Sequence, residues 1–252
     1  MELGLTGKKV LVTGGSKGIG KGIAASFIHE GASTAIVARS ADNLKSAKED
    51  LKDVFTIQAD LLNEGERKRS FEEFLDTFGT IDILINNVGG SSGGKVEETS
   101  LADFEKAMNL NYFSAVHLSK MAFSVMKEKH SGSIINISSI YGRESGGKPT
   151  YNNSKAALIS FTKAFADEAI KEGIRVNSVA PGAILHPSGN WQKRLDQDPE
   201  KINDFVEREI PAGRFGKVEE VANVVTFLAS EKASWVSGAS LNVDGGQSKM
   251  NM

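Results

Sequence analysis

The chain has 252 residues, 40% of them hydrophobic, which is enough to bury a substantial core in one large domain or two small ones. Its 30 basic and 32 acidic residues give a formal net charge of −2, which argues against nucleic acid or an anionic membrane as a partner. The absence of cysteine excludes a disulfide framework and a thiolate metal site, and it fits a reducing compartment.

One domain spanning residues 1–252 is predicted, because no linker or low-complexity run divides the sequence and apolar blocks recur evenly along it. The N-terminus lacks the long apolar core of a signal peptide, and no stretch approaches membrane-spanning length. We therefore expect a cytoplasmic protein whose partner is a small molecule, with no membrane and no nucleic acid involved.

Short apolar blocks alternate with longer segments of helical period, which predicts alternating strands and helices. Residues 10–12 and 83–85 are apolar at consecutive positions, so both faces of these strands should be covered by helices. Right-handed crossovers then give a doubly wound parallel α/β sheet of about seven strands, whose ligands bind beyond the carboxyl ends of the strands. The blocks predicted as strands are residues 8–13, 34–38, 55–59, 81–86, 133–138, 174–180 and 239–243.

A glycine-rich turn follows the first predicted strand, with Gly14, Gly18 and Gly20 in the spacing Gly-x-x-x-Gly-x-Gly. A helical pattern begins directly after it. Glycines at this position let backbone amides reach a pyrophosphate at the positive helix N-terminus. Glycine also closes ordinary turns between strands and helices, so this motif alone leaves nucleotide binding and a simple tight turn both open.

The second predicted strand ends in Ala38-Arg39-Ser40, where an NAD-binding protein is expected to carry Asp or Glu for the ribose hydroxyls. Arg39 can instead bind a 2′-phosphate, and Lys17 in the glycine-rich turn can supply a second positive charge. Either cation alone is typical of a solvated surface. Together they favour NADP(H) over NAD(H).

Polar residues stand at two further positions where packing does not readily explain them. Asn111 lies on an apolar stripe with Met108 and Ala115, so its amide should face the core and needs partners there. Ser138 and Ser139 follow a predicted strand, at the edge of the sheet where ligands bind. A satisfied core amide and ordinary turn serines are the structural alternatives.

Tyr151 and Lys155 are four residues apart at the start of a long helical pattern, so they share one helix face. An ammonium beside a phenol favours the phenolate, which suits the pair to general acid–base catalysis. The alternative is a surface helix with an amphipathic tyrosine and a lysine whose stem covers apolar surface.

These motifs occur in an order that resembles the short-chain dehydrogenase/reductase family over almost the whole chain, in particular its 3-oxoacyl-carrier-protein reductase-like members. The resemblance implies a single Rossmann-type domain and hydride transfer between a nicotinamide and a carbonyl or alcohol carbon. The segments that carry it are Thr13-Gly14-x-x-x-Gly18-Ile19-Gly20, Asp60, Asn86-Asn87-Val88-Gly89, Asn111, the serine pair, Tyr151-x-x-x-Lys155, Pro181-Gly182 and Asn242-Val243-Asp244-Gly245-Gly246.

The same resemblance implies roles for the predicted catalytic residues. Tyr151 is the general acid in reduction and the base in oxidation, while Lys155 lowers its pKa and holds the nicotinamide ribose. Ser139 polarises the substrate oxygen, and Asn111 continues the proton path to water through Lys155. No metal ligand is expected. The predicted NADP(H)-binding residues are Gly14, Ser16, Lys17, Gly18, Ile19, Gly20, Arg39, Ser40, Asp60, Leu61, Asn87, Val88, Gly89, Tyr151, Lys155, Pro181, Gly182 and Ile184.

Three positions depart from the family pattern. Val88 replaces the usual alanine and should alter only packing near the cofactor. His186 stands where relatives often carry a cofactor-contacting threonine; a donor role and an ordinary loop histidine are both open. Counting thirteen positions back from Tyr151 selects Ser138 as the reactive serine, whereas a Ser-x-x-Gly motif selects Ser139. Because loop length varies more readily than strand-end geometry, Ser139 is predicted.

The segment at about residues 184–215 corresponds to the mobile substrate lid of the family. Its aromatic residues can wall an apolar pocket, and Lys193 and Arg194 can meet an anionic group, although packing aromatics and solvated charges are commoner. Residues 90–94 and 141–148 should form the remaining rim. The aromatic residues of the lid are Trp191, Phe205 and Phe215.

We therefore predict an NADP(H)-dependent reductase of a small carbonyl compound, with a 3-oxoacyl thioester as one candidate. A dehydrogenase of a sugar or other secondary alcohol is the alternative, because the same residues serve both directions. A non-catalytic nucleotide-sensing protein is disfavoured, since a sensor needs no proton donor. The family resemblance also implies a homotetramer.

Overall fold

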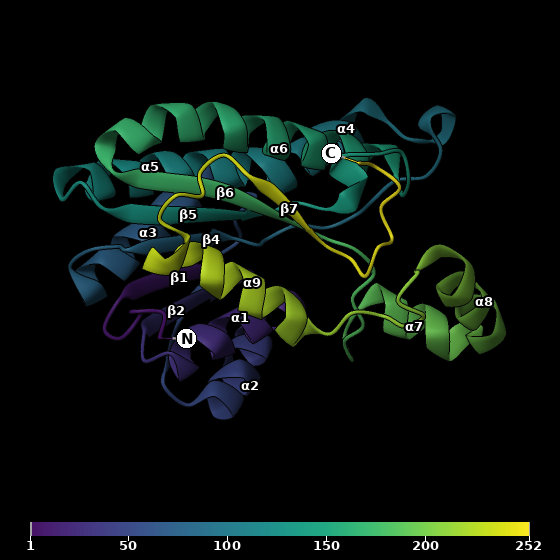
Figure 1. The fold of residues 1–252 in the computed structure, drawn as a ribbon, viewed down its shortest axis with the longest axis horizontal. Helices are drawn as coiled ribbons and strands as arrows, with labels where there is room; N and C mark the ends of the chain where they lie inside the picture. The colour runs from purple at the N-terminus through teal and green to yellow at the C-terminus, as the bar shows by residue number, and fades with distance from the viewer. Residues whose placement is uncertain (1, 252) are drawn as a thin grey trace.

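The computed structural model describes residues 2–251, and its central element is one parallel sheet (Figure 1). Seven strands lie in the order β3-β2-β1-β4-β5-β6-β7, with every neighbouring pair parallel. This confirms the predicted α/β fold, and each strand coincides with one of the predicted apolar blocks. The strands are β1 Lys9–Thr13, β2 Ser33–Ala38, β3 Val54–Gln58, β4 Ile83–Asn86, β5 Gly132–Ile137, β6 Ile174–Pro181 and β7 Ser240–Val243.

The strand order reverses at β1, which pairs with β2 on one side and β4 on the other. In register, Val12 lies opposite Ile36 of β2 and Ile85 of β4. The connections leaving β1 and β4 therefore diverge to opposite faces, and a crevice opens beyond the carboxyl ends of these two strands. This crevice is where the predicted nucleotide-binding residues gather.

Helices cover both faces of the sheet. Strand β1 shows why, because successive apolar side chains point to opposite faces and both faces must be buried. Val10 and Val12 belong to the core under one helix layer, whereas Leu11 belongs to the core under the other. Full burial of each such side chain contributes about 1.5–3 kcal/mol. In Figure 1, α1 and α9 lie on one side of the sheet and α5 and α6 on the other. The two layers are α1 Gly18–His29, α2 Ala41–Leu51 and α9 Val218–Ala229, then α3 Glu64–Phe78, α5 Ser114–Glu128 and α6 Pro149–Ala169.

The predicted lid contains two helices that stand apart from the sheet, at the right of Figure 1. A small apolar cluster of its own holds this part together, in which Val206 and Ile210 pack with Trp191, Phe205 and Phe215. Asp198 caps the second helix by accepting a hydrogen bond from the Lys201 amide, and proline follows at the first helical position. The helices are α7 Asn190–Gln197 and α8 Pro199–Glu209.

The helical segment predicted around Asn111 is not uniform. Helix α4 (Leu101–Met108) runs into a π-helical turn, η2 (Asn109–Phe113), before α5 begins. Such turns insert one residue into a helix and occur frequently at functional sites. Among residues 2–251, no helix is long and apolar enough to cross a membrane. The remaining short helical turns are η1 Val96–Glu98, η3 Ile140–Gly142, η4 Ile170–Glu172 and η5 Glu231–Ala233.

Candidate functional site

Two cavities adjoin at the carboxyl edge of the sheet. The nucleotide cavity, of about 640 Å³, is lined by the glycine-rich turn and by residues that follow β2, β3 and β4. The substrate cavity, of about 1310 Å³, is lined by residues that follow β5 and β6 and by the lid. Four residues line both cavities, namely Ile19, Asn87, Gly89 and His186.

The structure divides the predicted cofactor residues between the two cavities. Tyr151, Lys155, Pro181, Gly182 and Ile184 line the substrate cavity. All the others line the nucleotide cavity: Gly14, Ser16, Lys17, Gly18, Ile19, Gly20, Arg39, Ser40, Asp60, Leu61, Asn87, Val88 and Gly89.

The glycine-rich turn is fastened to the end of β4 by hydrogen bonds. The Asn87 amide nitrogen donates to the carbonyls of Thr13 at 2.9 Å and Gly14 at 3.2 Å. A Cβ at Gly20 would lie 2.4 Å from both the Gly14 carbonyl oxygen and Asn87 Nδ2, so only glycine fits there. Helix α1 then begins with Lys17 as N-cap and without a side-chain cap, which leaves its first amides available to an anion.

Positive charge is concentrated at the nucleotide cavity where β2 ends. Arg39 is exposed and, like Lys17, lines this cavity, while Ala38 stands where an acid would repel a phosphate. Ser40 caps α2 by accepting a hydrogen bond from the Asn43 amide, so the backbone around Arg39 is fixed. Two cations beside free helix amides form a donor set that fits a nucleotide with several phosphates.

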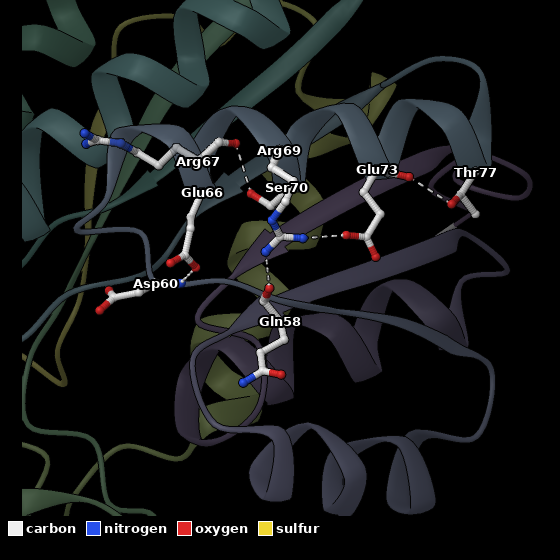
Figure 2. Close-up of polar contacts among 8 residues, drawn as sticks. All are labelled: Gln58, Asp60, Glu66, Arg67, Arg69, Ser70, Glu73 and Thr77. Atoms are coloured by element: carbon white, nitrogen blue, oxygen red, sulfur yellow. Dashed lines mark hydrogen bonds and ion pairs between the residues drawn. The ribbon is translucent and has the colours of Figure 1, made fainter.

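Asp60, after β3, is held from behind by α3. Its backbone amide donates to Glu66 Oε2 at 2.7 Å, and its Oδ1 accepts from the Leu62 amide at 3.1 Å. In Figure 2 the Asp60 carboxylate extends away from Glu66. Because Asp60 lines the nucleotide cavity, its second carboxylate oxygen is placed to accept from a donor there, such as the amino group of a purine.

Tyr151 and Lys155 lie on the first turns of α6, where they face the end of β5. Pro149 occupies the first turn of the helix, and the hydroxyl of the neighbouring Thr150 donates to the Ser92 carbonyl at 2.6 Å. Lys155 Nζ donates to the Ile137 carbonyl at 2.7 Å and lies 5.6 Å from the centroid of the Tyr151 ring. The two side chains share one helix face, as the spacing predicts, and both line the substrate cavity.

The two candidate serines have different surroundings. Ser138 is 2% exposed, and its Oγ lies 2.6 Å from Ser178 Oγ and 2.9 Å from the Val179 carbonyl, so it is engaged by β6. Ser139 instead forms a side-chain hydrogen bond with the Tyr151 phenol. Its Oγ also accepts from the Tyr141 amide at 3.2 Å, which starts the η3 turn.

Burial sets the pKa values of this pair. Desolvation raises the pKa of the Tyr151 phenol above its usual value, and the hydrogen bond from Ser139 opposes the rise. Desolvation also lowers the pKa of Lys155 from 10.5 to about 8. The sequence-based expectation that Lys155 lowers the tyrosine pKa is not met in this arrangement, because the ammonium is directed at the Ile137 carbonyl rather than at the phenol.

Asn111 is buried in the π-helical turn with its amide fully engaged. Its Nδ2 donates to the carbonyls of Gly90 at 3.0 Å and Ala107 at 2.9 Å, and its Oδ1 accepts from the Gly90 amide at 2.9 Å. A Cβ at Gly89 would lie 2.7 Å from Asn111 Oδ1 and 3.2 Å from Lys155 Nζ, so Gly89 sits between the two side chains. The structure contains no direct Asn111–Lys155 hydrogen bond, and the proton path through them stays a prediction.

The segment after β6 passes between the two cavities. The Gly182 amide donates to the Val243 carbonyl at 3.1 Å, and the Ala183 amide donates to Gln247 Oε1 at 2.7 Å. A Cβ at Gly18 would lie 2.7 Å from Cε1 of His186, so the imidazole packs directly on the glycine-rich turn. Burial and nearby Lys17 lower the pKa of His186, which favours its neutral form.

Thr13 begins the glycine-rich motif, and its hydroxyl has a structural role that the motif did not predict. Its hydroxyl donates to the Ile85 carbonyl at 3.2 Å and accepts from the amides of Asn87 at 2.9 Å and Val88 at 3.1 Å. This one hydroxyl therefore joins the ends of β1 and β4. The signal in the sequence is a polar residue that ends an otherwise apolar strand, at the crevice where ligands bind.

Known proteins match the chain over nearly its whole length. A family model described as enoyl-(acyl carrier protein) reductase matches residues 14–248. The 3-oxoacyl-[acyl-carrier-protein] reductase of Aquifex aeolicus is 36% identical over 252 residues, which cover 98% of this chain and 99% of the relative. The protein of the same name from Thermotoga maritima is 35% identical, with 96% of this chain and 98% of the relative covered.

Solved structures also resemble it closely. L-sorbose reductase from Gluconobacter frateurii, complexed with NADPH and L-sorbose, has a TM-score of 0.93 and 34% identity, covering 99% of this chain and 100% of its own. A putative gluconate dehydrogenase from Agrobacterium tumefaciens has a TM-score of 0.92 and 27% identity, covering 99% of both chains.

Proposed function

The chain belongs to the short-chain dehydrogenase/reductase family of oxidoreductases, and from that premise we propose that it reduces a carbonyl compound, or oxidises the matching alcohol, with NADP(H) preferred over NAD(H). When bound, the nicotinamide supplies or accepts the hydride. The observation that carries the proposal is the meeting of Ser139, Tyr151 and Lys155 in a cavity that adjoins the nucleotide cavity.

The residues of the substrate cavity handle the proton and the substrate oxygen. The Tyr151 phenol is protonated at neutral pH, and burial raises its pKa further, so it is the group that donates a proton to the oxygen of a carbonyl substrate. The Ser139 hydroxyl donates a second hydrogen bond to the same oxygen and orients it. Lys155, fixed by the Ile137 carbonyl, holds the nicotinamide ribose. Asn111 keeps the Gly89–Gly90 backbone in place beside Lys155.

The substrate is proposed as a 3-oxoacyl thioester, in line with the 3-oxoacyl-[acyl-carrier-protein] reductases that are 36% and 35% identical to the chain. A sugar or other secondary alcohol is the second candidate, which the structural likeness to L-sorbose reductase supports. A cytoplasmic location and a homotetramer complete the proposal on the basis of the family resemblance.

The reaction is tested with a broad screen of carbonyl and alcohol substrates, followed at 340 nm, and with the variant Tyr151→Phe. Consumption of NADPH identifies the reductase direction and its production the dehydrogenase direction. We expect Tyr151→Phe to lower turnover by at least about 100-fold, because general acid catalysis is lost, while cofactor affinity is kept. Tyr112→Phe, on the π-helical turn, is the matched control. Undiminished turnover in Tyr151→Phe would remove the mechanism.

Cofactor preference is tested by fluorescence titration of NADPH and NADH. Arg39→Asp should weaken NADPH binding by about 10-fold or more, because a charge-assisted pair with the 2′-phosphate is replaced by repulsion. NADH binding should change little. Lys68→Asp, an exposed charge reversal on α3, is the control. Equal affinity of the wild type for both cofactors would contradict the preference.

A further inference from the structure

Besides Lys155, four cations line the substrate cavity, and they come from three separate segments of the chain. Lys148 precedes α6, Lys193 and Arg194 belong to α7, and Lys201 belongs to α8. All four side chains are exposed, so their charges face the solvent-filled cavity rather than the core. Cations that converge from different elements on one cavity create a positive potential there, which attracts an anionic ligand.

Carboxylates near this wall already have partners. Asp198 is the one carboxylate that lines the cavity in the described part of the chain, and its Oδ1 caps α8. Glu144 and Glu209 act on the neighbouring Tyr141, but both are engaged by Lys249: its amide donates to Glu144 at 3.0 Å, and its Nζ lies 3.2 Å from Glu209. Only Glu209 has a cationic side chain as its partner, but the cations that line the cavity outnumber its one carboxylate, so the wall keeps a net positive charge.

Arg194 is the cation whose geometry is most restricted. Its guanidinium carbon lies 5.0 Å from the centroid of the Trp191 ring, as in a cation–π pair. Trp191 is itself stacked on Phe205, with 4.7 Å between ring centroids, and it packs against Phe215 at 5.4 Å. The planar donor fork of Arg194 is thus held by a rigid aromatic stack, which reduces the entropy lost when it binds a carboxylate or phosphate through two hydrogen bonds.

Arg194 lines the same cavity as Tyr141 and Ser139. Burial raises the pKa of Tyr141, and the positive charge of Arg194 opposes that rise, so the guanidinium lies within electrostatic range of the phenol. Tyr141 is the second residue after Ser139 and lies on the η3 turn. A ligand that spans from Ser139 to Arg194 would therefore lie in a cavity that Tyr141 also lines.

We propose that the substrate carries an anionic group, a carboxylate or a phosphate, which Arg194 binds while Lys148, Lys193 and Lys201 strengthen the local positive potential. This inference rests on the proposed function, because it assigns the reacting carbonyl or alcohol to the Ser139–Tyr151 end of the same cavity. A small oxo- or hydroxy-acid supplies the anion as a carboxylate, and a thioester supplies it as a phosphate of its carrier.

The first experiment measures binding without turnover. The chain has two tryptophans, so Trp235→Phe leaves Trp191 as the single indole reporter. Gluconate, acetoacetyl-coenzyme A, L-sorbose and the neutral N-acetylcysteamine thioester of acetoacetate are titrated against Trp191 emission. We expect one of the two anionic probes to bind more tightly than its neutral counterpart, with an affinity that falls as salt is raised.

Variants at the wall then identify the cation responsible. In the same background, Arg194→Gln should weaken binding of the preferred anion by about 10- to 100-fold, with less than about a twofold effect on the neutral probe. Arg194→Lys should restore part of the affinity, because it keeps the charge without the fork. Arg208→Gln, which removes an exposed arginine paired with Asp204 on α8, is the matched control.

Kinetics separate the inference from the proposed function. If the inference holds, Arg194→Gln raises KM for the anionic substrate far more than it lowers kcat. A loss confined to gluconate assigns a carboxylate, and a loss confined to acetoacetyl-coenzyme A assigns a phosphate. Equal losses for charged and neutral probes, or no preference for the anions, overturn the inference even if turnover is found. Charge-dependent binding without turnover of any probe overturns the proposed function alone.

Discussion

Ser138 and Ser139 lie next to each other at the end of β5, yet their side chains point to opposite surroundings. Both residues line the substrate cavity, but successive residues of an extended chain alternate in direction, so their hydroxyls meet different partners. Ser138 is engaged by Ser178 and the Val179 carbonyl, and Ser139 is bonded to the Tyr151 phenol. The Ser-x-x-Gly motif selects the residue beside the tyrosine, whereas counting from the tyrosine selects its neighbour.

Alanine substitutions separate the two serines. Ser139→Ala should lower kcat by about 100- to 1000-fold, since one donor to the substrate oxygen is removed. Ser138→Ala should leave kcat within a few-fold and lower the free energy of unfolding by about 1 kcal/mol, because it removes a buried hydrogen bond. Steady-state kinetics and urea titration of both variants provide the comparison. A larger kcat loss in Ser138→Ala would reverse the assignment.

Lys155 carries a stability cost that can be measured. Burial lowers its pKa from 10.5 to about 8, so between these values the unfolded chain binds more protons than the folded chain. Stability therefore rises with pH from about 8 to 10.5, and the full penalty applies below pH 8. At about 1.4 kcal/mol per pKa unit, this penalty is about 3 kcal/mol. Replacing Lys155 removes the penalty, but it also removes the hydrogen bond to the Ile137 carbonyl, which contributes about 1 kcal/mol.

Lys155→Met should accordingly be inactive but more stable than the wild type, by about 2 kcal/mol at pH 7, with the difference shrinking toward pH 10. Urea unfolding at the two pH values measures it. Lys171→Met, which removes an exposed lysine, should change stability by less than about 0.5 kcal/mol at either pH. A variant that is less stable than the wild type at pH 7 would show that Lys155 is not destabilising.

Spacing alone predicted that Tyr151 and Lys155 share a helix face, because the helical period fixes that relation. It could not predict the direction of the tyrosine pKa. Spacing describes two neighbours on one helix, whereas the pKa depends on how deeply the packing of α6 on β5 buries both groups. The carbonyl of Ile137, which accepts a hydrogen bond from Lys155, cannot be identified from the sequence pattern either.

At the scale of elements, strand β6 holds the end of helix α9 through Arg175. This residue is 8% exposed, and its guanidinium donates to the carbonyls of Leu228 at 2.6 Å, Ala229 at 3.1 Å and Ser230 at 2.9 Å. These are carbonyls that the end of a helix leaves without an intrahelical partner. One buried cation therefore stabilises the end of a helix that covers the same face of the sheet as α1.

Arg175→Met should lower the free energy of unfolding by about 3 kcal/mol, because three buried carbonyls lose a charged donor. Arg69→Met provides the control: Arg69 lies on the exposed face of α3, where it binds Glu73 and the Gln58 carbonyl (Figure 2), and its loss should cost less than about 1 kcal/mol. Thermal and urea unfolding measure both. Equal losses in the two variants would contradict a special role for Arg175.

The strands could be predicted from the sequence and the π-helical turn could not. Seven apolar blocks separated by helical patterns leave little choice of fold once crossovers are right-handed. Residues Asn109–Phe113 contain neither Gly nor Pro, and one extra residue in a helix changes its apolar period too little to be read. The turn follows from the packing of Asn111 against Gly90, which joins elements distant in sequence.

At the scale of the whole molecule, the doubly wound topology determines where the site lies. All seven strands are parallel, so the polar residues that follow them meet at one edge. The lid helices lie beyond the same edge, as Figure 1 shows, and contribute Trp191 and Arg194 to the substrate cavity. Sequence patterns predicted which residues gather at this edge. They could not predict that Lys148 and Lys201 join Arg194, because no local pattern relates the three segments.

The last prediction concerns assembly, and it is based on the exposed surface at the β7 edge of the sheet. Trp235 is 99% exposed just before β7, and Leu241 is 44% exposed on β7, the edge strand of the sheet. An exposed edge strand beside a large apolar side chain is a typical contact surface. Burying a tryptophan removes about 200 Å² from water and contributes about 5 kcal/mol.

We therefore expect the wild type to be a tetramer at micromolar concentration and Trp235→Ser to dissociate into smaller species. Light scattering after size exclusion measures both, with Val96→Ser as an exposed apolar control. A monomeric wild type, or an unchanged mass in Trp235→Ser, would rule out this surface as the interface.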